Sequence, residues 1–173
     1  YALKGVPLNV LEVSHQKFSA NKELTELYSI ITTYPDAEIC IATDADADGS
    51  RIRGLVSLFM FKYFPEHLNN GKMKILRTPI AIGKKNNEVK EWAYTFADVN
   101  KIDHKLDVSY VKGLGSWSEK DLKHIINQDT MDEMLPTVSI ADTDLFKNWF
   151  SGSTINYRKE QILKAAPFDI MKV

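Results

Sequence analysis

The stretch EICIATDADADGSRIRGLVSLFMF, residues 38–61, carries the strongest structural pattern in the sequence. It opens with a short apolar run rich in β-branched residues, which predicts a buried strand. Three aspartates then occupy every second position, Asp44, Asp46 and Asp48, before an apolar pattern with helical spacing that Pro65 stops. Because carboxylates this close repel one another, the loop predicts a cation among them.

The rest of the chain alternates between strand patterns and helix patterns. Ser116 and Glu119 have the spacing of a capping box before one of the helices, and the polar run 83–87 predicts a hairpin. We expect a short strand or a strand and turn at 8–13, and strands at 38–43, 72–79, 88–96, 107–111 and 137–140. We expect helices at 20–34, 52–63, 116–127, 142–150 and 155–166. This alternation predicts an α/β fold with a mostly parallel central sheet flanked by helices. The aspartate loop would lie at the carboxyl end of a buried strand, where open α/β sheets bind ligands.

Composition narrows the class of protein. The chain has 173 residues with 44% hydrophobic and 26% charged residues, as in ordinary globular domains. It has neither an apolar run near the ~20 residues that span a bilayer nor a signal peptide, so we expect no membrane partner. The net charge of −1 predicts that any contact with nucleic acid uses a local patch. Cys40 is the single cysteine; we expect it to be buried in its strand, in a reducing compartment.

Three interpretations of the aspartate loop can be compared. A solvated turn explains Asp and Gly but not three alternating carboxylates. An EF-hand fits residues 44–49, yet it needs a glutamate at its twelfth position, where this chain has Leu55. A Mg²⁺ site for phosphate chemistry fits best, because Arg51 and Arg53 open the following helix, whose N-terminus favours anions.

The motif TDADADGSRIRGL resembles the Asp-x-Asp-x-Asp-Gly motif of the TOPRIM domain of type IIA DNA topoisomerases, in its eukaryotic-like or T-even-phage-like form. Further segments resemble that family in the same order along almost the whole chain. They are LKGVPLNV (3–10), YFPEHLNNGKMKILRTPI (63–80), EWAYTF (91–96), YVKGLGS (110–116) and INYRKEQI (155–162). The aspartate motif together with the Lys-Gly-Leu-Gly motif at this spacing carries most of the resemblance.

The resemblance implies a Rossmann-like TOPRIM domain at 1–166, followed at 167–173 by the start of a linker toward a winged-helix domain. It implies Mg²⁺ ligation by Asp44, Asp46 and Asp48. It also implies contacts with double-stranded DNA through a further set of residues: Lys4, Arg51, Arg53, Lys112, Gly113 and Gly115. The activity implied is ATP-dependent double-strand cleavage, passage and religation by a larger, symmetric assembly, in the cytoplasm or, for a eukaryotic source, the nucleus.

The chain also departs from the family pattern. The family's upstream Glu-Gly-Asp-Ser-Ala motif, its nucleophilic tyrosine and its ATPase domain are not found in these 173 residues, so we expect a fragment or split-gene subunit that is inactive alone. Lys4 and Val6 replace an arginine and a lysine, and Arg51 replaces a histidine. Lysine cannot form the bidentate phosphate contact of arginine. The alternatives are a stand-alone metal-dependent nuclease and a non-catalytic assembly module.

Overall fold

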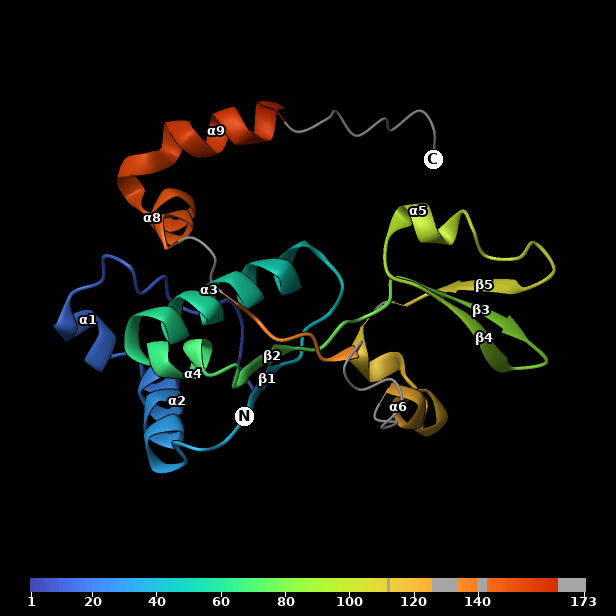
Figure 1. Ribbon diagram of the computed structural model, residues 1–173, viewed down its shortest axis with the longest axis horizontal. Coiled ribbons are helices and arrows are strands. Elements are labelled where there is room, and N and C mark those ends of the chain that lie inside the picture. The colour runs from blue at the N-terminus through green and yellow to red at the C-terminus, as the bar shows by residue number, and fades with distance from the viewer. Residues whose placement is uncertain (112, 126–133, 140–142, 165–173) are drawn as a thin grey trace.

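The computed structural model describes residues 1–111, 113–125, 134–139 and 143–164. Its helices and strands are interspersed along the chain, as Figure 1 shows. Their bounds are α1 His15–Ser19, α2 Lys22–Thr33, β1 Ile39–Ile41, α3 Ala47–Tyr63, α4 Pro65–Asn69, β2 Met73–Ile75, β3 Ala81–Lys85, β4 Glu88–Ala93, α5 Phe96–Val99, β5 Asp107–Tyr110, α6 Glu119–Ile125, α8 Asp144–Phe150 and α9 Ile155–Lys164, with 3₁₀ turns at Leu114–Ser116 and Gly152–Thr154. The predicted α/β class is confirmed.

A parallel pair of strands forms the base of the helical part of the molecule. β1 pairs with β2 in parallel, with Ile39 opposite Met73 and Ile41 opposite Ile75. The far side of β2 is covered by an antiparallel segment, because Val138 N donates to the Met73 carbonyl at 2.8 Å. The strand predicted at 137–140 is therefore reduced to a bridge between Thr137 and Lys74, and position 140 lies outside the described residues.

Helix α3 is the centre of the hydrophobic core. Residues 55–60 are all buried. The sequence pattern predicts a single apolar face on this helix, so more of its circumference is buried than expected. The reason is that α3 packs on both sides. Phe59 meets aromatic rings from α1 and from the end of α3 itself, and on another face Phe61 stacks on Phe146 of α8 at 4.9 Å.

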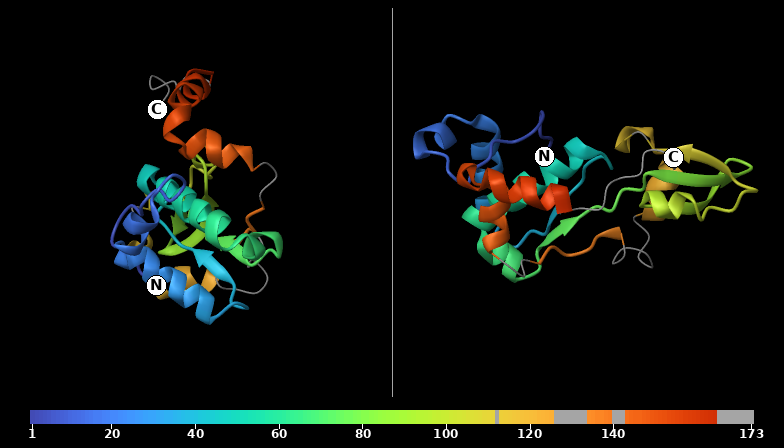
Figure 2. Two further views of the ribbon diagram at one scale, coloured as in Figure 1. Left: turned by 90° about the vertical axis from the view of Figure 1, so that its left-hand side faces the viewer. Right: turned by 90° about the horizontal axis from the view of Figure 1, so that it is seen from above.

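Strands β3, β4 and β5 form a separate antiparallel sheet in the order β4-β3-β5. The predicted hairpin turn is confirmed at Asn86 and Asn87, whose φ angles of 52° and 63° lie in the left-handed region that asparagine tolerates in two-residue hairpin turns. Figures 1 and 2 show this sheet at one end of the molecule, with α1 to α4 at the other and extended segments between them.

Of the short strand or strand and turn expected at 8–13, the strand is not formed and only the turn is present. That segment is irregular, with a turn at Leu11 and Glu12, because side chains bind its backbone. Asn9 Oδ1 accepts from Leu11 N at 3.0 Å, and Lys62 Nζ donates to the Val10 carbonyl at 2.5 Å. These contacts satisfy polar groups that would otherwise need a neighbouring strand.

The expected burial of Cys40 is also wrong. Along β1 the side chains alternate, with Ile41 buried and Cys40 exposed. A strand covered on one face alternates in this way, whereas the apolar sequence alone suggested cover on both faces. Partial burial still raises the pKa of the Cys40 thiol.

Two further predictions concern helix ends and boundaries. α6 begins at Glu119 and Leu122 N donates to the Ser118 carbonyl at 3.0 Å, so the residue before the helix is Ser118, two residues after the cap predicted at Ser116. The predicted boundary at 166–167 lies outside the described residues.

Within the described part of the chain, no helix has both the length and the apolar character that crossing a membrane requires.

Candidate functional site

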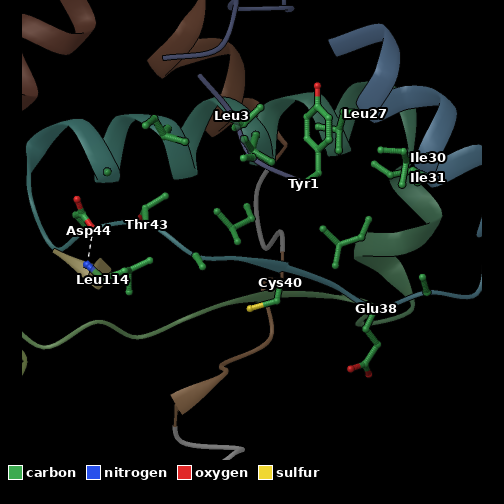
Figure 3. Close-up of a pocket in the computed structure, with 18 of the residues that line it drawn as sticks. Tyr1, Leu3, Leu27, Ile30, Ile31, Glu38, Cys40, Thr43, Asp44 and Leu114 are labelled. Carbon is green, nitrogen blue, oxygen red and sulfur yellow. Dashed lines mark hydrogen bonds between the residues drawn. The ribbon is translucent and has the colours of Figure 1, made fainter. Parts of the chain in front are cut away.

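The aspartate loop runs from the end of β1 into the first turn of α3, and it contacts a segment far along the chain. Leu114 N donates to Asp44 Oδ1 at 2.9 Å, across 70 positions of sequence. Figure 3 shows this bond at the end of the strand. The Asp-x-Asp-x-Asp motif and the Gly-Leu-Gly segment therefore form one site, as their joint resemblance to one family implies.

Two glycines allow this close approach. A Cβ built on Gly49 would lie 2.1 Å from the Asp44 carbonyl oxygen, and one built on Gly113 would lie 2.9 Å from Asp44 Oδ2. The first clash is with backbone, which cannot rotate away. Around Gly115, by contrast, nothing in the described structure lies within 4 Å of a built Cβ, so none of the described residues approaches Gly115 closely.

Asp46 and Asp48 do not continue the extended strand. Asp46 is the N-cap of α3, and its Oδ1 accepts from Gly49 N at 2.7 Å. This bond satisfies one of the free N–H groups at a helix start. Asp48 lies in the first turn and is exposed. The three carboxylates thus occupy a strand end, a cap and a helix turn, because the chain turns into α3 at Ala47 rather than after the motif.

The loop has the chemistry of part of a cation site. Asp44 is half-buried, and in the described part of the chain no ion pair joins Asp44, Asp46 or Asp48 to a basic side chain. Their only hydrogen bonds there come from backbone N–H groups, so negative charge is left for a cation. No group of three or more His, Cys, Asp or Glu side chains among the described residues is arranged to hold a metal ion. A Mg²⁺ ion here would need waters, phosphate oxygens or a further carboxylate.

The predicted basic residues lie around the loop without converging on it. Arg51 is exposed in the first turns of α3, and Arg53 Nη2 donates to Ser50 Oγ at 2.9 Å. Because residues two apart on a helix face different directions, the two arginines do not form one anion site. Lys4 is exposed and its backbone N donates to Glu23 Oε1 at 2.5 Å. Lys112 lies outside the described residues.

Sequence reasoning missed two members of the site. One is the Leu114 backbone N–H, whose role no residue type reveals. The other is Thr43, which is 9% exposed and whose Oγ1 has no hydrogen-bond partner among the described residues. Its position directly before Asp44 was the available signal, because a polar residue that ends a buried strand needs a partner.

Comparison with known proteins relates the chain to one group of enzymes. It is 28% identical to a DNA topoisomerase 4 subunit of Borreliella burgdorferi over 84% of this chain and 25% of that protein. It is 30% identical to human DNA topoisomerase 2-beta over 71% of this chain and 9% of that protein. The chain thus spans a quarter or less of these two relatives. Bacterial and eukaryotic proteins match almost equally, so the finer resemblance stays a prediction.

No protein-family model matches the chain. Among solved structures, the DNA-binding, cleavage and re-ligation domain of Plasmodium falciparum topoisomerase II matches with a TM-score of 0.77 at 24% identity, over 95% of this chain and 25% of the other. The similarity to this solved structure supports the fold, and the sequence similarity to the two topoisomerases supports homology with them. The chain is therefore a homologue of one part of the type II DNA topoisomerase subunits.

Proposed function

We propose that this chain is the Mg²⁺-binding TOPRIM part of a type II DNA topoisomerase, supporting reversible double-strand cleavage by a tyrosine in another domain. One observation carries the proposal: Asp44 is held by Leu114 N and has no basic partner among the described residues. A carboxylate fixed by a backbone bond but not neutralised is suited to hold a cation.

Each residue of the loop has a role in this proposal. Asp44 and Asp46 would ligate Mg²⁺ directly, and Asp48, in the first turn of α3, would ligate it or bind its waters. The metal, when bound, would supply positive charge next to the phosphate that is cut. Leu114 N and Gly49 N hold the two carboxylates in place before any ligand arrives. Arg51 and Lys112 would contact the DNA backbone.

The rest of the activity would lie outside this chain. The nucleophilic tyrosine and ATP hydrolysis would come from other domains or subunits of a symmetric assembly, with double-stranded DNA as substrate. We propose that the isolated chain binds metal weakly and cleaves nothing. The expected location is where the DNA is: the bacterial cytoplasm, or the nucleus of a eukaryote.

A metal titration tests the proposed ligands. With Mg²⁺ or Mn²⁺ added at millimolar concentration, the amide resonances of residues 41–53 should shift. Asp44→Asn is the sharpest variant, because its amide oxygen still accepts from Leu114 N while the negative charge is removed. We expect metal affinity to fall at least about 100-fold. Asp36→Asn is the matched control, since Asp36 is an exposed aspartate paired with Lys72.

Activity separates the proposal from an assembly module. In an enzyme reconstituted with the missing domains, Asp44→Asn should abolish cleavage and leave assembly intact. Unchanged cleavage with a folded Asp44→Asn loop would contradict the metal role. Cleavage by the chain alone would instead support the stand-alone nuclease.

A further inference from the structure

A pocket of about 110 Å³ lies on one face of the antiparallel sheet. Ile82 of β3 lies directly opposite Trp92 of β4 and Ser109 of β5, and residues opposite each other in a sheet share a face. The other face is covered, because a Cβ built on Gly83 would meet the Leu106 side chain at 2.9 Å. The pocket therefore lies on the face away from Leu106, and its walls include Ile82, Lys84, Trp92, Ser109, Val111 and Trp117.

Trp117 brings an unused hydrogen-bond donor to this pocket. Its Nε1 is buried and has no partner among the described residues, and an indole N–H can only donate. The rings of Trp117 and Trp92 pack edge to face with 6.4 Å between their centres, so the two indoles form one apolar wall. A buried donor without an acceptor destabilises a structure, and an oxygen atom that reaches Nε1 would satisfy it.

Lys84 and Ser109 add two more donors to the same pocket. Lys84 is half-buried, and within the described part of the chain it forms no ion pair, even with Asp107, which lies directly opposite it in β5. The Ser109 hydroxyl forms no hydrogen bond with the described residues either. One positive charge and three donors, with no acidic side chain among the residues that line the pocket, favour an anionic ligand with oxygen acceptors.

The size and the walls of the pocket indicate which anion fits. One water takes about 30 Å³ in the liquid, so the pocket has room for a carboxylate on one or two methylene groups. Ile82, Val111 and the two indole rings give such a short stem apolar contact. A phosphate in a nucleic-acid backbone fits less well, because sugars are attached to it on two sides and a pocket of this size admits only one chain end. The observations thus favour a carboxylate side chain over a nucleic acid.

We propose that this pocket binds an aspartate or glutamate side chain from a polypeptide segment outside these 173 residues. One carboxylate oxygen accepts from Trp117 Nε1 and the other faces Lys84 Nζ, with the Ser109 hydroxyl donating to either. The pocket also borders the segment that holds Asp44, because Trp117 N donates to the Leu114 carbonyl at 3.3 Å and Leu114 N donates to Asp44. An occupant that fixes Trp117 therefore restrains Leu114 as well. The inference rests on the pocket and does not depend on the proposed metal role.

A small carboxylate tests the proposal in the whole chain. The probe is the α-amide of N-acetylglutamate, and the matched control is its neutral analogue, the α-amide of N-acetylglutamine, at equal ionic strength. We expect the Trp117 indole N–H resonance to shift on addition of the carboxylate, and the analogue to bind about tenfold more weakly. The Leu114 amide should shift with the same dissociation constant. Trp117→Phe removes one of the three indole resonances of the chain and thereby assigns it.

A pair of lysine substitutions shows whether the pocket is responsible. Lys84→Met keeps the length of the side chain and removes its charge, whereas Lys85→Met changes an exposed neighbour on the other face of β3. Carboxylate binding should weaken about tenfold with Lys84→Met and less than about twofold with Lys85→Met, while the amide shifts of α3 show that both variants fold.

Three results would overturn the proposal: no shift of the Trp117 indole up to about 0.1 M probe, equal binding of the neutral analogue, or binding that Lys84→Met leaves unchanged. Tighter binding of dimethyl phosphate than of the carboxylate would also overturn it, because the pocket would then take a nucleic-acid backbone. A Leu114 amide that does not respond would overturn the link to Asp44. A Mg²⁺ titration without the probe measures the proposed metal site separately, and Lys84→Met should leave that titration unchanged, so the failure of either proposal is recognised on its own.

Discussion

Gly49 and Gly113 are the positions where a single methyl group would disturb the site most. A Cβ at Gly49 would clash with the backbone of Asp44, and a Cβ at Gly113 would clash with the carboxylate of Asp44. The sequence marks Gly49 as a turn residue and Gly113 as part of a motif, but only the structure shows that the two glycines face the same aspartate.

Gly49→Ala should destabilise the fold, because its Cβ would lie 2.1 Å from the Asp44 carbonyl oxygen. Forcing a methyl group into a packed site costs about 1–3 kcal/mol. Gly115→Ala is the matched control: because no described residue lies within 4 Å of its built Cβ, the free energy of unfolding should change by less than about 0.5 kcal/mol. Urea unfolding of both variants checks this, and equal stability of the two would contradict it.

Gly113→Ala should act on the site rather than on the fold. Its Cβ would meet side-chain atoms of Asp44 at 2.9–3.0 Å, and the carboxylate can rotate away at the loss of its bond from Leu114 N. We expect a change in the Leu114 amide chemical shift and weaker Mg²⁺ binding, with nearly unchanged urea unfolding. An unaltered Leu114 resonance would show that the contact is not formed.

His67 should make stability depend on pH. It is 7% exposed and its Nε2 has no partner among the described residues. Burial, and then the charge of Lys72, hold its pKa below the ordinary value, while Asp36 raises it slightly. The unfolded chain therefore binds this proton more tightly, so stability should be full above the unfolded pKa of about 6.5 and fall as the pH drops through it toward the folded pKa.

Unfolding by urea at several pH values between 7.5 and 5 measures this effect. His67→Phe should flatten the dependence on pH, whereas His104→Gln should leave it unchanged, because the His104 side chain is 90% exposed. An identical dependence in wild type and His67→Phe would rule out His67 as its source.

Among the helices and strands, α3 belongs both to the aspartate loop, at its first turn, and to the hydrophobic core, at its middle. Its first turn carries the cap at Asp46 and its middle is fully buried. The sequence predicts this helix and its end at Pro65 well, because strong apolar spacing and a proline are local signals. It does not predict that α3 is covered on two sides, since that depends on α8, about ninety residues later in the chain.

Phe59→Ala should therefore cost about 3–5 kcal/mol, the usual cost of removing a buried phenylalanine. Phe59 is 1% exposed, whereas Phe96 is 59% exposed, and Phe96→Ala should cost less than about 1 kcal/mol. Thermal and urea unfolding of the two variants provide the comparison. A smaller loss for Phe59→Ala than for Phe96→Ala would place the core elsewhere.

At the scale of the molecule, the two sheets differ in how much they bury. Among the described residues, six of the seven largest fully buried side chains lie in the part formed by β1, β2 and the helices around them, and the seventh, Pro79, lies just before β3. β3 and β4 bury smaller groups such as Ala81 and Ala93. We expect the antiparallel sheet to open before the helical part, since less buried apolar area means lower local stability.

Native-state hydrogen exchange in rising urea tests this order. Amides of Ile82 and Ser109, which lie opposite each other in β3 and β5, should exchange through an opening of lower free energy than the amide of Phe59. Coincident exchange of all three would show a single cooperative unit.

The α/β class and the order of elements could be predicted because periodicity, prolines and the Asn-Asn turn act locally. The irregular course of residues 8–13 could not, because side chains of Asn9 and Lys62 take the place of a strand partner. The aspartates of the site were identifiable from residue type, whereas the contribution of Leu114 was not, because every residue other than proline has a backbone N–H.

The hydrogen bond from Leu114 to Asp44 closes a loop of 70 positions, and this bears on how freely the chain between them can change in length. The entropy of closing a long loop grows only with the logarithm of its length, so ten extra residues would cost about 0.1 kcal/mol. The turn at Asn86 and Asn87 lies within that loop, at the tip of the hairpin. Insertions there should leave the aspartate loop unaltered, so that the length of the hairpin can vary independently of the chemistry at its base.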